Sequence, residues 1–207
     1  MDAFTTLTAT AIPVDMVNVD TDQIIPARFL PTPRNDPKYR TFLFHDLRYD
    51  HSGAERPDFV LNREPFRDGG IIVADENWGC GSSREAAVWT LVANGIRCVI
   101  APSFGDIHYN NAMKNGMLPI RLSKEDCATL RGQLNADPGA KITVDLEAQI
   151  VTAPDGSEYG FEIDPFQKYR MLNGLDDIDV TMEYEKEFEA FEKRYRKEAS
   201  WLFQEPG

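Results

Sequence analysis

GIIVADENWGCGSSREAAVWTLVANGIRCVIA, residues 70–101, contains two apolar runs separated by a glycine-rich segment and a helix-like segment. The apolar run at residues 70–74 predicts a short buried strand, and residues 83–94 predict a helix that ends at Gly95. Residues 97–101 predict a second strand. A strand, a helix and a strand in this order predict two parallel strands joined by a right-handed crossover.

The same alternation continues after this stretch. Residues 103–114 predict a helix that ends at an Asn-Gly pair, and residues 117–122 predict a strand. Residues 123–135 predict a further helix, because they begin with an N-cap serine followed by acidic residues. The sequence therefore predicts the α/β class, with a parallel sheet and crossover helices.

The N-terminal third is less regular. Residues 5–14 predict a strand, and residues 18–26 predict a polar turn that leads into a short apolar segment. Residues 31–38, PTPRNDPK, contain three prolines and predict an irregular loop of the kind that often carries recognition. Residues 41–67 mix aromatic and charged residues and favour no single element.

After residue 139, apolar and polar residues alternate with a period of two. Residues 141–146, 149–153 and 157–163 predict a small antiparallel meander. Residues 164–173 then predict a helix that ends at Gly174. This part of the chain adds an antiparallel extension to the predicted sheet.

The C-terminal segment is rich in charge, and residues 177–203 predict one long helix. Four aromatic residues recur along it at helical spacing: Tyr184, Phe188, Phe191 and Tyr195. Such a stripe favours core packing or a contact between subunits over a ligand site. We expect a single domain over residues 1–207, with a C-terminal helical extension at about residues 177–204.

Composition excludes several classes of partner. The 207 residues carry a net charge of −12, which argues against a nucleic-acid partner, because nucleic-acid binding depends on clustered Lys and Arg. No apolar run is long enough to span a membrane, and the N-terminal residues do not resemble a secretory signal, so we expect a cytoplasmic protein. Cys80, Cys98 and Cys127 are far apart and form no C-x-x-C motif, which predicts no metal site within this chain.

The glycine-rich segment combines groups that suit an anion. Gly79 and Gly81 allow the backbone to approach a ligand closely. We expect Ser82 and Ser83 at the N-cap and first turn of the helix, where free N–H groups and the helix dipole favour a bound anion. Arg84 adds a planar fork that matches a carboxylate or a phosphate.

Other interpretations of this segment are weaker. A serine followed by Glu85 is also an ordinary helix start, but capping alone requires neither two glycines nor an arginine. The sequence contains no Walker pattern, no G-x-G-x-x-G and no G-x-S-x-G, which argues against nucleotide binding and acyl transfer. A serine can instead move a proton at a carbon next to a carboxylate, if positive charge stabilises its deprotonated form. That chemistry matches the elimination of water from a hydroxy acid.

Five segments together resemble a known family. They are ENWGCGSSRE at 76–85, VNVDTDQIIPARF at 17–29, VIAPSFGDIHYNNAMKNGMLPIRLS at 99–123, DLEAQIV at 145–151 and MLNGLDDI at 171–178. The chain resembles the small subunits of 3-isopropylmalate dehydratase, which correspond to the swivelling domain of the aconitase superfamily. The resemblance covers nearly the whole chain.

The resemblance implies an aconitase-like swivelling β/β/α domain that closes over a large subunit, in a heterodimer or a heterotetramer. The family's large subunit holds a 4Fe-4S cluster with its own three cysteines, so this chain is expected to bind no cofactor itself. Together the subunits isomerise 2-isopropylmalate to 3-isopropylmalate through isopropylmaleate, a step of leucine biosynthesis.

The resemblance also implies roles for individual residues. Ser82 falls at the position of the catalytic base, Ser83 at a hydrogen-bond position for the substrate, and Arg84 at a contact with a substrate carboxylate. An arginine that binds the distal carboxylate falls near Arg34, with Arg28 as the alternative. Either arginine could instead be an ordinary solvated side chain.

Two residues depart from the family pattern. Ala86 stands where the family commonly has His, and Trp78 stands where a smaller aromatic residue is usual. These departures leave open a related hydro-lyase that acts on citraconate, a methylmalate or dimethylmalate. A non-catalytic module that binds a small dicarboxylate is the alternative from another functional class.

The remaining candidates favour structural interpretations. Asp20 and Asp22 could form paired acids, but hydrogen bonds to their own backbone in an Asx turn are the plainer interpretation. Cys80 could be a reactive thiolate, but a small residue that fills a tight turn is favoured. No role is assigned to the scattered histidines His45, His51 and His108.

Overall fold

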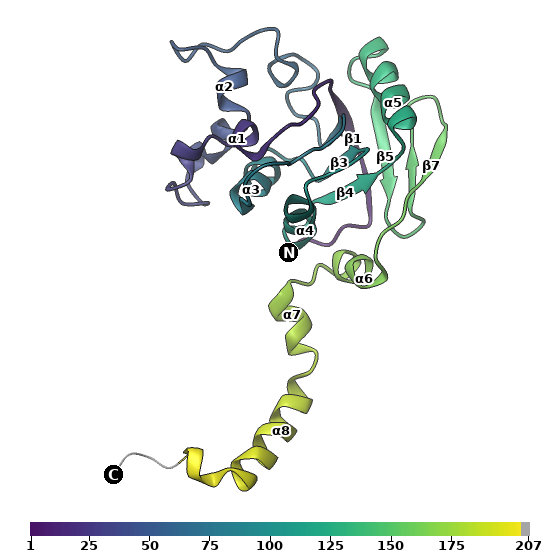
Figure 1. Ribbon diagram of the computed structural model, residues 1–207. Helices are drawn as coiled ribbons and strands as arrows, with labels where there is room; N and C mark the ends of the chain where they lie inside the picture. Colours follow the sequence, from purple (N-terminus) through teal and green to yellow (C-terminus); the bar gives the residue numbers. More distant parts are fainter. Residues whose placement is uncertain (204–207) are drawn as a thin grey trace.

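A single mixed sheet organises the chain in the computed structural model, which describes residues 1–203. The strand order is β4-β3-β2-β1-β5-β6-β7, and Figure 1 shows helices on both sides of the sheet. The strands are β1 (Thr6–Val14), β2 (Ile71–Ala74), β3 (Cys98–Ala101), β4 (Leu118–Arg121), β5 (Lys141–Asp145), β6 (Ile150–Thr152) and β7 (Glu158–Gly160).

The helices surround this sheet and extend beyond it at the C-terminus. The α-helices are α1 (Thr21–Ile24), α2 (His45–Arg48), α3 (Glu85–Ala93), α4 (Asp106–Lys114), α5 (Lys124–Ala136), α6 (Pro165–Asn173), α7 (Asp177–Met182) and α8 (Glu185–Glu198). Short 3-10 helices are η1 (Ala27–Phe29), η2 (Pro37–Phe42), η3 (Val60–Asn62) and η4 (Ser200–Phe203). None of the helices in residues 1–203 is long and apolar enough to cross a membrane.

Strand β1 joins the two halves of the sheet. Its second part, residues 11–14, pairs in parallel with β2, while residues 6–10 pair antiparallel with β5. Strands β2 and β3 are buried along their whole length, as expected for parallel strands covered on both faces. The predicted parallel sheet and the predicted antiparallel meander are both confirmed.

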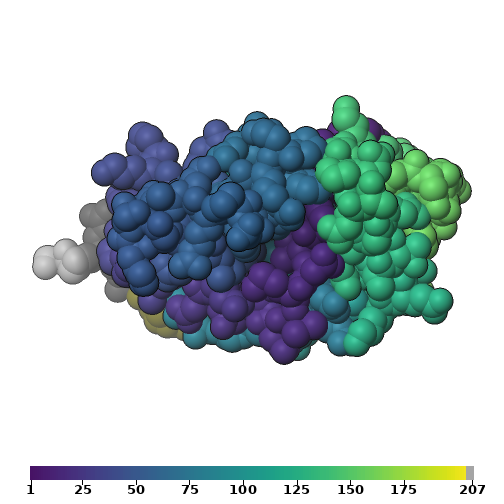
Figure 2. Space-filling model, turned by 90° about the horizontal axis from the view of Figure 1, so that it is seen from above, coloured from purple at the N-terminus to yellow at the C-terminus, as the bar shows by residue number. Residues whose placement is uncertain are grey.

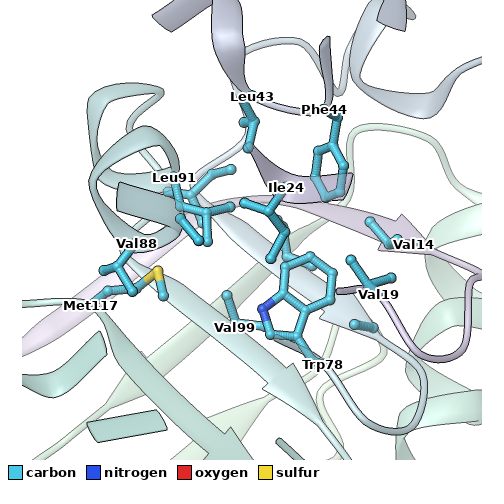
Figure 3. Packing of buried hydrophobic residues seen from close by; sticks show 14 of the residues in the cluster. Val14, Val19, Ile24, Leu43, Phe44, Trp78, Val88, Leu91, Val99 and Met117 are labelled. Carbon is cyan, nitrogen blue, oxygen red and sulfur yellow. The ribbon is translucent and has the colours of Figure 1, made fainter. Parts of the chain in front are cut away.

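Alternate strand residues enter two separate hydrophobic clusters. Ile72 and Val99 face the cluster formed with α3 and the N-terminal helices, whereas Ile71 and Ile100 face the cluster formed with α5 and α6. Figure 3 shows Trp78 packed among residues of the first cluster such as Ile24 and Val19, although it belongs to the loop after β2. The loop is therefore attached to the core next to the predicted functional turn.

The segment at 41–67, for which the sequence favours no element, folds as short helices and irregular turns. It buries Phe42, Leu43 and Phe44 in the first cluster. In Figure 2 its blue residues lie beside the purple N-terminal residues, and the green residues of α5 and the meander lie on the other side. The proline-rich stretch before it is irregular as predicted, until η2 begins at Pro37.

The prediction of one continuous terminal helix over residues 177–203 is wrong. Helix α7 ends at Met182 and α8 begins at Glu185, because the N–H of Tyr184 donates to the carbonyl of Thr181, which tightens the last turn. β-branched residues just before this point also disfavour a continued helix. Figure 1 shows α7 and α8 projecting away from the sheet, and we call residues 177–203 the C-terminal arm.

Candidate functional site at the carboxyl ends of the parallel strands

Three loops pair with one another where β1, β2 and β3 end. Their backbones continue the sheet by short parallel bridges, between Asp20 and Cys80 and between Trp78 and Phe104. The supporting hydrogen bonds are Gly79 N to Val19 O (2.7 Å), Thr21 N to Cys80 O (3.0 Å), Trp78 N to Ser103 O (3.0 Å) and Gly105 N to Trp78 O (2.9 Å). The glycine-rich turn is thus held from both sides by neighbouring loops.

The structure also corrects two predicted helix starts. Residues 103–105 pair with the loop at residue 78, so α4 begins at Asp106 and not at residue 103. Arg84, with extended backbone angles of −135° and 107°, is the N-cap of α3, and it makes no side-chain cap bond. The prediction that Ser82 and Ser83 occupy the N-cap and first turn is therefore wrong.

The two serines lie on the surface just before α3. Both residues are exposed, and the Ser82 carbonyl accepts a hydrogen bond of 2.9 Å from the Thr21 hydroxyl. Within residues 1–203 neither the Ser82 nor the Ser83 hydroxyl has a hydrogen-bond partner. The turn therefore presents two free hydroxyls on a backbone that is held in place.

Arg84 forms an ion pair with Asp22 of α1. The Arg84 side chain is 18% exposed and the Asp22 side chain is 52% exposed. The Asx-turn interpretation is wrong for Asp22, because its carboxylate binds this arginine. It is close to correct for Asp20, which caps α1 by accepting a hydrogen bond of 2.7 Å from the Gln23 N–H.

The tight turn depends on two glycines, its own Gly79 and Gly105 of the loop after β3. Gly79 has a φ of +69°, and a β-carbon there would lie 2.3 Å from Cγ of His108. A β-carbon on Gly105 would lie 2.5 Å from the carbonyl oxygen of Gly79. No side chain fits at either position without a shift of the neighbouring loop or of the imidazole.

The imidazole of His108 packs against this turn at Gly79, although the sequence indicated no role for the residue. The residue is 3% exposed, and burial lowers the pKa of its imidazole to about 4. Neither ring nitrogen has a partner in the described part of the chain. The ring is therefore neutral at physiological pH. Its spacing in the sequence carried no signal of this contact.

The thiol of Cys80 does not favour a reactive thiolate. Burial, and then the nearby charge of Asp20, raise the pKa of Cys80. The residue therefore agrees with its interpretation as a small side chain in a tight turn. Cys98 and Cys127 are buried in the second cluster. Across residues 1–203, no three His, Cys, Asp or Glu side chains are grouped to hold a metal ion.

Arg28 and Arg34 lie apart from the serine turn and differ in their partners. Arg28 forms a two-point ion pair with Asp46, in which NH1 donates to Oδ2 over 2.9 Å. This bond lowers the pKa of Asp46 to about 2. The Arg34 guanidinium lies over the ring of Trp89, 5.2 Å from its centroid. In the described residues neither arginine bonds to the Ser82–Arg84 segment.

A polar network that sequence analysis missed connects the proline-rich loop to the start of α3. Trp89, beneath Arg34, donates from Nε1 to Oδ1 of Asn115 over 3.1 Å. Asn115 in turn donates from Nδ2 to Oε1 of Glu85 over 2.8 Å. Glu85 follows Arg84 directly, so the network joins Arg34 to the serine turn through side chains that are far apart in the sequence.

Comparison with known proteins agrees with this architecture. Residues 1–125 match the family described as Aconitase C-terminal domain. Residues 128–165 match LeuD_N, and residues 177–205 match the C-terminal domain of the 3-isopropylmalate dehydratase small subunit. The 3-isopropylmalate dehydratase small subunit of Granulibacter bethesdensis is 52% identical over 98% of this chain and 96% of its own length.

The chain belongs to the family of 3-isopropylmalate dehydratase small subunits.

Further relatives support this membership over the full length. The small subunit of Paramagnetospirillum magneticum is 50% identical over 98% of this chain and 100% of its own. A crystal structure of 3-isopropylmalate dehydratase (leuD) from Methanocaldococcus jannaschii superposes with a TM-score of 0.62 and 26% identity. It covers 91% of this chain and 98% of that one, which confirms the fold class predicted from the small-subunit motifs.

The two departures from the small-subunit pattern are both buried. Trp78 is fully buried, and its ring lies 6.0 Å from that of Phe44 in an edge-on contact. Ala86 is 9% exposed, on the face of α3 that packs on the first cluster. Because both side chains point into the core, the departures affect packing behind the turn, and the exposed serines of this small subunit are unchanged.

Proposed function

We propose that this chain is the small subunit of a 3-isopropylmalate dehydratase and supplies half of its active site. The observation that carries the proposal is the pair of exposed, unbonded serine hydroxyls beside Arg84, on a turn held by three paired loops. The names of the relatives favour isopropylmalate over citraconate, methylmalate or dimethylmalate as the substrate. A cytoplasmic location and a complex of one or two pairs of subunits are part of the proposal.

Ser82 acts as the base in this proposal. Its deprotonated oxygen removes the proton from the carbon next to a substrate carboxylate, while hydroxide leaves from the adjacent carbon and a double bond forms. Water then adds across the alkene with the opposite orientation, and Ser82 returns the proton. The 4Fe-4S cluster of the large subunit supplies the Lewis acid for the departing hydroxyl.

Ser83 and Arg84 hold the substrate carboxylate next to this base. The guanidinium of Arg84 is planar and can bind a carboxylate through two N–H groups. Asp22 already orients it through a partly exposed ion pair, which a substrate carboxylate can join at little cost, because such pairs contribute little energy in water. Positive charge at this position also stabilises the dianion that develops when the proton leaves.

Arg34 is the better candidate for the distal carboxylate. The Arg28 guanidinium is occupied by Asp46 and lines a separate cavity of about 530 Å³ with His45, His51 and other residues of the segment at 45–56. Arg34 is exposed and is held by stacking on Trp89, which leaves its N–H groups free to donate. The hydrogen bonds through Trp89 and Asn115 hold this arginine in a fixed position relative to the start of α3.

Reconstitution tests the proposal. The chain is mixed with the cluster-bearing large subunit, and alkene absorbance is followed with isopropylmalate, citraconate and dimethylmaleate in parallel. We expect turnover with isopropylmalate that requires both subunits. No gain over the large subunit alone would end the proposal. Tight binding of isopropylmalate by the lone chain in calorimetry would instead support a non-catalytic module, because half a site binds weakly.

A Ser82→Ala variant tests the role of the base. It should lower kcat by about 10²- to 10⁴-fold while the affinity between the subunits stays unchanged, because the hydroxyl acts in the transition state. Ser83→Ala is the matched control and should mainly raise KM. Normal turnover by the Ser82→Ala variant would show that the base is elsewhere.

A further inference from the structure

The C-terminal arm exposes an unusual amount of apolar surface. The stripe formed by Tyr184, the N-cap of α8, and by Phe188, Phe191 and Tyr195 runs along this helix, and these residues are between 38% and 56% exposed. None of the residues of α8 is buried against any described part of the chain. Phe203, whose ring centroid lies 5.9 Å from that of Tyr195, continues the surface, and the neighbouring Trp201 and Leu202 are 67% and 58% exposed. A contiguous apolar surface of this kind marks an interaction site.

We propose that the aromatic stripe of α8 docks on the large subunit of the dehydratase, a step that rests on the function proposed above. The partner surface is a hydrophobic groove of the large subunit, which receives the four rings at i, i+4, i+7 and i+11. The arm thereby holds the two subunits together through contacts of α8, in addition to any contacts around the Ser82–Arg84 turn.

The root of the arm lies beside the candidate active site. A cavity of about 340 Å³ is lined on one side by Glu85 and Asn111, and on the other by residues 176–178 at the start of α7. Glu85 directly follows Arg84. A partner that closes over the Ser82–Arg84 turn therefore lies next to the point where the arm leaves the body.

Ion pairs hold this root in a defined position. Asp177 binds Arg170 over 2.7 Å and Lys114 over 3.1 Å, and the Arg170 side chain is 5% exposed. The hydrogen bond from Lys114 contributes most to lowering the pKa of Asp177. Asp176 caps α7 by accepting from the N–H groups of Ile178 and Asp179. The arm is therefore anchored to α4 and α6 at its base, and α8 is presented beyond that anchor.

The family matches separate the arm from the rest of the chain. Residues 1–125 match the Aconitase C-terminal domain and residues 128–165 match LeuD_N, whereas the arm falls in a third match, residues 177–205, which is named for the C-terminal domain of the dehydratase small subunit. The arm therefore belongs to proteins whose other subunit is a separate polypeptide. Noncovalent docking by the arm would join two such polypeptides.

A second copy of this chain fits the stripe less well. In an antiparallel pair of α8 helices that stacks Phe188 on Phe191, Glu187 would face Arg194 of the other helix. Glu185 would, however, face Glu192, so one attractive contact is offset by one repulsive contact. The excess of Glu early in α8 and of Lys and Arg late in it also matches the helix dipole without any partner.

Alanine variants of the full-length chain test the docking surface. Phe188→Ala combined with Phe191→Ala removes two rings, and Glu189→Ala combined with Lys193→Ala removes two charged groups from the other side of α8. Each pair introduces two alanines and leaves the net charge unchanged, so both should keep α8 helical. Affinity for the cluster-bearing large subunit is measured by anaerobic calorimetry, and helicity by circular dichroism.

The phenylalanine pair should raise the Kd for the large subunit at least about tenfold, because buried aromatic anchors dominate interfaces. The charged pair should leave the Kd within about twofold, and kcat at saturating small subunit should be the same for both. Wild-type affinity of the phenylalanine pair would overturn the proposal. Loss of a dimer of this chain, with the Kd for the large subunit unchanged, would also overturn it and identify the second copy as the occupant.

The same measurements separate failure of the docking surface from failure of the proposed function. Ser82→Ala should show the opposite behaviour, with a normal Kd and a low kcat. A wild-type complex that the phenylalanine pair weakens, but that turns over none of the three substrates, would overturn the proposed function and support the docking surface. Absence of any complex with the wild-type chain would overturn both.

Discussion

The imidazole of His108 lies directly against the backbone of Gly79. A β-carbon on Gly79 would lie 2.3 Å from Cγ of His108, and the residue has a φ of +69°. On the other side, Gly105 approaches the Gly79 carbonyl so closely that it also has no room for a side chain. The turn that carries Ser82 is therefore built on a close contact between one loop, the next loop and a buried ring.

This contact predicts a large loss of stability for Gly79→Ala. The added methyl would face both an unfavourable backbone angle and a clash, and we expect a loss of about 2–5 kcal/mol in the free energy of unfolding. Gly95→Ala is the matched control, since Gly95 has a φ of +85° but nothing within 4 Å of a β-carbon. That change should cost about 1 kcal/mol. Urea unfolding measures both, and equal losses would contradict the contact with His108.

His108 predicts a specific dependence of stability on pH. Burial lowers its pKa to about 4, from an ordinary value of 6.5. Between these two values the unfolded chain binds a proton that the folded chain does not, so stability falls as the pH falls from about 6.5 to about 4. The slope from this residue approaches about 1.4 kcal/mol per pH unit within that window.

A His108→Phe variant tests this assignment. Phenylalanine keeps an aromatic ring under the turn and removes the titrating group, so stability should change less between pH 6.5 and pH 4 than in the wild type. Asp46, with its pKa at about 2, contributes its own loss only as the pH falls from about 4 towards 2. Identical pH profiles for the variant and the wild type would show that His108 is not the group responsible.

Substitutions in the ion pair between Arg84 and Asp22 should affect catalysis much more than stability. Both side chains are partly exposed, so Asp22→Asn should change the free energy of unfolding by less than about 1 kcal/mol. Arg84→Lys keeps the charge but loses the two-point fork, and should lower kcat/KM by about 10- to 100-fold. Asp22→Asn keeps the fork and removes only its ion-pair partner, so it should lower kcat/KM less than Arg84→Lys does. Steady-state kinetics of the reconstituted enzyme would reject the carboxylate contact if Arg84→Lys were fully active.

We expect alanine substitutions of Arg34 and Arg28 to have different effects on the KM for the substrate. Arg34→Ala should raise KM for isopropylmalate about tenfold or more, because a guanidinium free to bind the distal carboxylate is lost. Arg28→Ala removes the same type of side chain from the same region, but its donors are already occupied by Asp46. It should leave KM nearly unchanged. The reverse result would assign the distal carboxylate to Arg28.

Several features of the site could be predicted because they are local in the sequence. A short apolar run followed by a glycine-rich segment placed the Ser82–Arg84 turn at the end of a buried strand, where the structure has it. The aromatic stripe on α8 was also recognisable from its spacing alone, but its burial was not. The structure exposes the stripe, so core packing within the described chain is the wrong interpretation, and a contact between subunits remains a prediction.

The sequence by itself determined the alternation of strands and helices, because periodic burial leaves a periodic pattern of apolar residues. Only the tertiary structure decided which side chains surround the serines. Asp22 reaches Arg84 across 62 residues of sequence, and His108 supports Gly79 from another helix. Helix α3 starts two residues after Ser83, and Thr21 of α1 donates hydrogen bonds to the carbonyls of Cys80 and Ser82 before that start. Such partners depend on which distant segments pack together, and no local pattern encodes that.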